Sequence, residues 1–234
     1  MRPKESQYSI ILDNIALRFR LLSLFYIIYL VAPMYTLITF ENALNNYLNA
    51  PQETMNNPEL LNIVLKSFAT YTITYVLSTI LLVLNIFLVT RSIKQLATLL
   101  RKPKVAYWIY SMVIFLILVA LIVNTYIIIT LPRALELIKN IKRMSSNQGI
   151  TDVMLRDLTL LQITLINLIL IAIGITLRYI TEKHELLEYL QTGASMLMIG
   201  GILELVERYV YGFGLGPIII ILGLLLLGRK RKIY

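Results

Sequence analysis

The chain has 234 residues, of which 58% are hydrophobic and 15% charged, and its mean hydropathy is +0.74. Soluble domains are about 45–50% apolar and about 25% charged, so this chain has too few polar side chains to cover a globule in water. It has no cysteine and one histidine, His184, which excludes disulfides, thiolate metal sites and multi-histidine centres, and we expect no cofactor.

The apolar residues gather in long blocks, two of which, 105–131 and 158–177, contain no charged residue. A helix needs about 20 such residues to cross a bilayer, and the blocks lack the alternation of a spanning strand. We therefore predict an all-α, polytopic transmembrane helical bundle with about six spans. One transmembrane domain would cover 21–228.

The N-terminal residues 1–20 form an amphipathic lead-in that predicts a short interfacial helix. The first span, 21–40, is longer than the core of a signal peptide, so we interpret it as a retained anchor; it contains Pro33. The segment 41–59 is rich in asparagine and predicts an exposed loop.

A second span is predicted over 61–90, followed by a basic connector over 91–104. The third span, 105–131, opens with aromatic residues of the kind that favour the membrane interface, among them Trp108. Pro132 suits the first turn of a new helix, which we expect to lie at the membrane surface.

Thr151 or Asp152 is a suitable N-cap for the helix that includes the fourth span, 158–177. The last two spans, 190–206 and 215–228, are short. They contain glycines that let helices approach closely, so we expect a tight hairpin. These glycines are Gly193, Gly200, Gly201, Gly223 and Gly228. A basic cytoplasmic tail, 229–234, ends the chain.

Charge decides the predicted orientation. With six spans and a cytoplasmic N-terminus, 15 of the 22 basic residues fall on the cytoplasmic side, which favours cytoplasmic termini. The same rule accounts for the net charge of +9, so we expect the lipid bilayer and not nucleic acid as the partner.

Polar residues inside spans are candidate functional groups, because burying them without partners is costly. The candidate polar path comprises Thr70, Thr74, Ser78, Asn85, Asn124, Asn167 and Glu204. The alternative is that these groups serve only hydrogen bonds between helices.

Glu204 is the one charged residue expected within the membrane. Its spacing to Arg208 allows an ion pair on one helix face. Either a proton- or cation-coupled site or a helix end emerging among the headgroups fits this pattern.

His184 and Glu188 have the spacing of two metal ligands, but two candidates on a solvated linker rarely make a site, and we expect none. The sequence contains no HExxH, GxSxG or GxxxxGK[ST] motif, so we expect no enzyme.

The C-terminal quarter is similar to a group of uncharacterised archaeal multi-pass membrane proteins. The similarity rests on Tyr179, Glu182 and Lys183, on the segment 190–203 and on the glycine-punctuated last span. It implies a prokaryotic cell membrane and no assigned activity.

Two functions stay open. The chain is either a non-catalytic subunit or scaffold, associated with other membrane subunits or with itself, or a small transporter or channel component with a polar path lined by threonine and asparagine.

Overall fold

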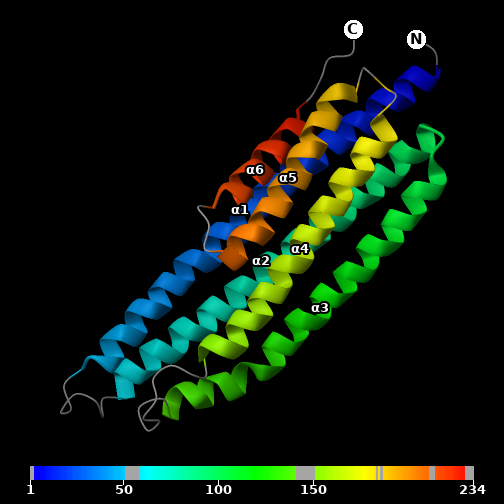
Figure 1. The fold of residues 1–234 in the computed structure, drawn as a ribbon. Helices are drawn as coiled ribbons and strands as arrows, with labels where there is room; N and C mark the ends of the chain where they lie inside the picture. The colour runs from blue at the N-terminus through cyan, green and yellow to red at the C-terminus, as the bar shows by residue number, and fades with distance from the viewer. Residues whose placement is uncertain are drawn as a thin grey trace. The chain divides into compact units, whose positions relative to one another are not determined.

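The computed structural model describes residues 3–50, 58–140, 151–182, 184, 187–210 and 214–229. This part of the chain is helical (Figure 1). The helices are α1 (Pro3–Leu48), α2 (Pro58–Leu99), α3 (Pro103–Asn140), α4 (Thr151–Thr181), α5 (Glu188–Val210) and α6 (Leu215–Leu227).

Five of these helices, α1 to α5, are long and apolar enough to cross a membrane. The prediction of an all-helical, multi-pass membrane protein is thus confirmed. The sixth, α6, has 13 residues. At 1.5 Å per residue it is about 20 Å long, shorter than the roughly 30 Å of hydrocarbon in a bilayer.

The helix boundaries differ from the prediction at the N-terminus. Because α1 is one helix of 46 residues with Pro33 inside it, the described residues 3–20 form no separate interfacial helix. The helix also enters the segment 41–59 that was expected to be a loop. Phe40 and Tyr47 are buried in a hydrophobic cluster, and this burial favours continued helix where composition alone indicated a loop.

Pro132 does not begin a new helix either, because α3 continues through it to Asn140. A proline inside a helix removes one backbone hydrogen bond. Here Leu131, Leu135 and Ile138 pack in the same hydrophobic cluster on either side of the proline. Their burial offsets the lost bond.

The chain divides into two compact units that cut across the single domain expected over 21–228. The first unit comprises Met1–Ile27, Leu82–Ala120 and Gln162–Tyr234, and the second comprises Ile28–Leu81 and Leu121–Leu161. Each of α1 to α4 contributes residues to both units, because each passes through a boundary within its own length.

In the second unit, the core forms around Phe40, Tyr47, Val64, Phe68 and Ile138. The rings of Phe40 and Phe68 lie 5.1 Å apart between centroids, which is the spacing of a favourable aromatic pair. This cluster joins α1, α2 and α3 within the unit.

In the first unit, α5 and α6 form the predicted tight hairpin (Figure 1). A Cβ on Gly200 would lie 2.8 Å from the backbone nitrogen of Ile220, and one on Gly193 would lie 3.1 Å from the carbonyl oxygen of Gly223. Only glycine permits so close an approach.

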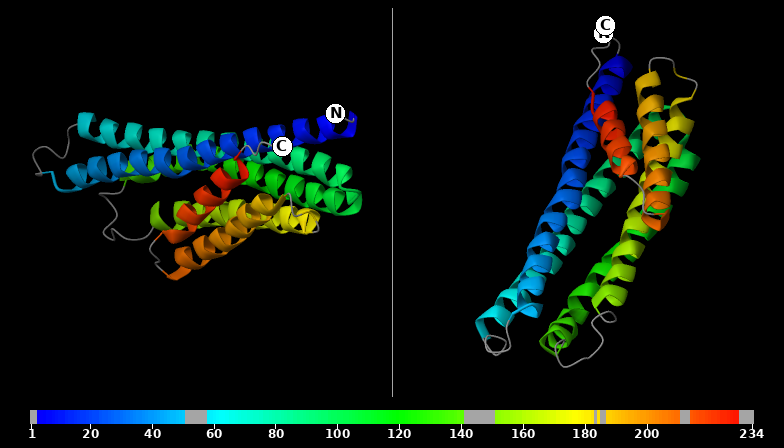
Figure 2. Two further views of the ribbon diagram at one scale, coloured as in Figure 1. Left: turned by 90° about the horizontal axis from the view of Figure 1, so that it is seen from above. Right: turned by 60° about the vertical axis from the view of Figure 1, so that its left-hand side comes forward.

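The first-unit part of α1 and the end of α6 are neighbours (Figure 2). The guanidinium Nε of Arg20 donates a hydrogen bond of 2.5 Å to the carbonyl oxygen of Gly228. This contact ties the end of α6 to α1.

Candidate functional site at Glu204

Glu204 lies near the end of α5 and is only 2% exposed. The Tyr26 hydroxyl donates a hydrogen bond of 2.6 Å to carboxylate Oε2. The Arg208 guanidinium lies 3.8 Å from Oε1, which confirms the ion pair predicted from the spacing. The side chain of Asn167 also lies beside the carboxyl group of Glu204.

These partners come from separate parts of the fold, because Tyr26 belongs to α1 and Asn167 to α4. Each is 1% exposed, so both groups reach Glu204 from the interior. The side chain of Arg208 is 44% exposed and brings a positive charge from the surface. An isolated buried carboxylate is very costly; here three polar groups on three helices stabilise it.

The neighbouring carboxylate, Glu207, holds the start of α6. It accepts hydrogen bonds from the backbone N–H groups of Leu215 at 2.8 Å and Gly216 at 3.1 Å. The first N–H groups of a helix lack partners within the helix, and the helix dipole favours a negative charge there. The two glutamates of α5 thus fix α1, α4 and α6 around one point.

Gly216 brings the backbone of α6 against Glu204 itself. A Cβ at Gly216 would lie 2.6 Å from the Cα of Glu204, closer than real Cβ atoms come. Gly216 is the second residue of α6 and a contact point of the site.

Of the predicted polar path, the structure brings only Asn167 and Glu204 into direct contact. Thr70 is exposed, Thr74 is half-buried, and the Ser78 hydroxyl donates to the carbonyl of Tyr75 in its own helix at 2.9 Å. These three residues belong to the second unit, as does Asn124, which is buried. Asn85, Asn167 and Glu204 belong to the first. A path through all seven stays a prediction.

Sequence reasoning missed Tyr26. The residue is 178 positions from Glu204, and nothing local distinguishes it from the other tyrosines of the chain. Its place in an otherwise apolar predicted span was a weak signal, since a buried tyrosine hydroxyl usually needs a partner.

In the described part of the chain, no group of three or more histidine, cysteine, aspartate or glutamate side chains is arranged to hold a metal ion. No known family model, curated protein or solved structure matches the chain. Its function therefore has to be inferred from its own residues.

Proposed function

We propose that the chain is a non-catalytic subunit or scaffold of a membrane assembly, with both termini in the cytoplasm. The proposal rests on one observation, which is that other side chains of the protein enclose Glu204. The carboxylate is buried, and its partners come from neighbouring helices. An arrangement of this kind holds helices together and leaves no reacting group open to a substrate.

Other buried polar groups support the same reading. The hydroxyls of Thr72, Thr79, Thr90 and Thr176 each donate to the carbonyl oxygen four residues earlier in the same helix. A threonine bonded in this way satisfies its hydroxyl locally. We therefore also propose that the chain is not an enzyme.

The surface of α3 in the first unit offers a place where a neighbouring subunit would pack. Trp108 and Phe115 stand seven positions apart and are 81% and 64% exposed. Such spacing places them near one face of the helix. This pair faces either lipid or another protein, and an experiment can separate the two.

The test is photo-crosslinking in native membranes with a benzophenone amino acid at Phe115, and at Leu222 on α6 as a matched exposed control. We expect a protein adduct from Phe115 and a particle in mild detergent whose protein mass exceeds 26.9 kDa. A partnerless monomer that gives only lipid adducts would contradict the proposal.

A second function, proton-coupled transport, is favoured by one observation: the carboxyl of Glu204 lies in the interior of an apolar bundle, where ionisable groups often mark proton paths. Proton flux into liposomes, followed with a pH-sensitive dye, tests it. Flux that Glu204→Gln abolishes and Glu182→Gln leaves intact would support transport. The absence of flux, or flux in Glu204→Gln, would exclude it.

A further inference from the structure

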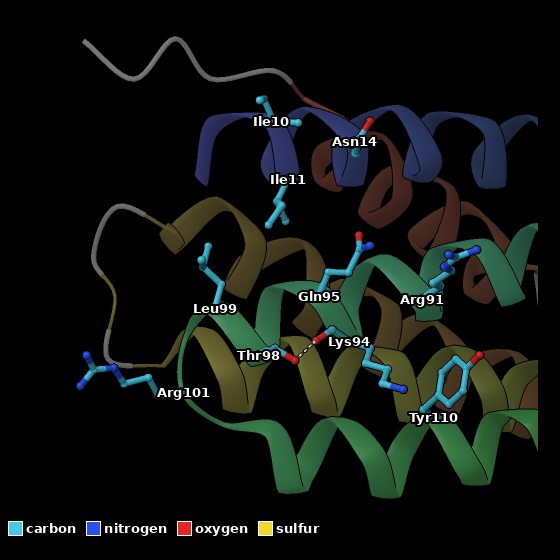
Figure 3. Close-up of a pocket in the computed structure, with 10 residues that line it drawn as sticks. All are labelled: Ile10, Ile11, Asn14, Arg91, Lys94, Gln95, Thr98, Leu99, Arg101 and Tyr110. Atoms are coloured by element: carbon cyan, nitrogen blue, oxygen red, sulfur yellow. Dashed lines mark hydrogen bonds between the residues drawn. The ribbon is translucent and has the colours of Figure 1, made fainter. Parts of the chain in front are cut away.

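An open cavity of about 860 Å³ lies in the first unit between α1, the end of α2 and the start of α3 (Figure 3). Its described lining includes three cations, Arg91, Lys94 and Arg101, and no acidic side chain. In the sequence these residues belong to the basic connector, and neither the Glu204 site nor the proposed scaffold function uses them.

Helix geometry explains why the polar residues share this cavity. Arg91, Lys94, Gln95 and Thr98 stand at positions i, i+3, i+4 and i+7 of α2, so they lie along one face of the helix. Figure 3 shows them in a row that Arg101 continues past the last turn, while Tyr110 approaches from α3.

The three cations lack a negative partner among the residues that the structure describes. The ammonium of Lys94 lies over the rings of Tyr107 and Tyr110, at 4.3 and 4.6 Å from their centroids. Within the described residues, the guanidinium groups of Arg91 and Arg101 make no hydrogen bond or ion pair. Like charges along one helix face repel each other, so an anion in the cavity would relieve this repulsion.

Three other basic side chains of the first unit do have hydrogen-bond partners. Arg18 donates to the carbonyl oxygen of Leu88, Arg20 to that of Gly228 and Lys102 to that of Tyr179. Those side chains hold backbone carbonyl groups of the unit. Among the described residues, the guanidinium groups of Arg91 and Arg101 hold none.

The backbone of Arg101, at the edge of the cavity, also has an unusual conformation. Arg101 has φ 58, and its N–H and that of Lys102 bond back to Thr98 and Ala97, the pattern that ends a helix with a left-handed residue. Glycine usually occupies such a position because side chains disfavour it. An arginine held there is a strained residue, of the kind that gathers at functional sites.

The cavity also lies at the depth where lipid headgroups are expected. Tyr107 and Trp108, in the first turns of α3, are 57% and 81% exposed, as aromatic residues of the membrane interface are. Ile10, Ile11 and Leu99 give the cavity an apolar part. Basic pockets between membrane helices at this depth suit anionic headgroups.

We propose that this cavity binds a phosphate-bearing anion, either the headgroup of an anionic phospholipid or a soluble phosphate. Arginine donates to phosphate through a planar pair of N–H groups. Arg91 and Arg101 would attract the anion by their positive charge, and the amides of Asn14 and Gln95 supply neutral donors.

The experiment uses the full chain, purified in an uncharged detergent, and measures bound molecules by native mass spectrometry. The probes are phosphatidylglycerol, phosphatidylcholine and inorganic phosphate. The variants are Arg91→Gln, Arg101→Gln and the double substitution. Lys104→Gln is the matched control, because it removes one exposed charge from the same connector outside the cavity.

Near a membrane surface each cation adds roughly fivefold to the affinity for an anion, so the double variant should bind about twenty-five-fold more weakly. Lys104→Gln should bind as the native protein does. A loss confined to phosphatidylglycerol identifies a lipid, and a parallel loss for inorganic phosphate identifies a soluble anion; both support the site. Thermal stability without ligand should be unchanged in every variant, since these arginines hold no bond.

Three results would overturn the proposal. One is binding of phosphatidylcholine as tight as that of phosphatidylglycerol, together with no binding of inorganic phosphate. Another is equal weakening in Lys104→Gln, which would indicate a diffuse surface charge. The last is undiminished binding in the double variant.

Discussion

Tyr26 shows how much one hydroxyl can matter inside this protein. It is 1% exposed and donates at 2.6 Å to the carboxylate of Glu204. Hydrogen bonds to charged groups contribute about 1.5–3 kcal/mol, and the loss of one partner leaves the other buried without compensation. The pair joins α1 to α5 across 178 residues of sequence.

We expect Tyr26→Phe to lower the free energy of unfolding by about 1.5–3 kcal/mol, because it removes the hydroxyl and keeps the ring. Unfolding in mixed micelles measures the change. Tyr35→Phe, on the same helix and 72% exposed, is the control and should change nothing. Equal stability of both variants would show that the hydroxyl does not stabilise Glu204.

At the scale of elements, the α5–α6 hairpin depends on glycines at the points where the two helices meet. Gly200 and Gly216 let the two backbones meet, and Glu207 satisfies the first N–H groups of α6. Because α6 is only 13 residues long, it gains little from its own helix propensity. Packing against α5 therefore decides whether it forms.

The substitution Gly216→Ala should destabilise the protein by more than about 3 kcal/mol, because the added methyl group would overlap the backbone of Glu204, which cannot move aside as a flexible side chain would. Gly214→Ala, two residues earlier, is the comparison. A Cβ there meets nothing within 4 Å, and the only cost is its φ of 72, roughly 1–2 kcal/mol. Thermal denaturation in detergent ranks the two, and an equal loss would argue against the contact.

At the scale of the whole molecule, the described part of the chain consists mainly of helices that are long enough to cross a membrane. The α2 helix is 42 residues long and continuous, about 63 Å at 1.5 Å per residue. We therefore expect α2 to cross a membrane completely. The contact of Arg20 with Gly228 places the first-unit part of α1 beside the end of α6.

The chain has no cysteine, so single cysteines can report topology without background. We expect Asn49→Cys and Lys104→Cys, both exposed, to react with a membrane-impermeant maleimide from opposite sides. The Lys104→Cys side should be cytoplasmic, as the positive-inside rule predicts. Labelling of both from the same side would contradict a single complete crossing by α2.

Composition and hydropathy alone were sufficient to predict a helical, multi-pass membrane protein, because the cost of placing long apolar runs in water does not depend on which neighbours they find. The i, i+4 pair of Glu204 and Arg208 and the close approach of Gly193, Gly200 and Gly223 could also be predicted, since both depend on local spacing.

Only the tertiary structure decided the rest. The helix continues through Pro132 because side chains from other helices bury its flanks, and Tyr26 meets Glu204 because the fold joins distant residues. The row of cations on α2 was visible in the sequence as a basic connector, but their sharing of one cavity was not. Spacing along a chain determines which residues share a helix face, whereas packing determines what that face meets.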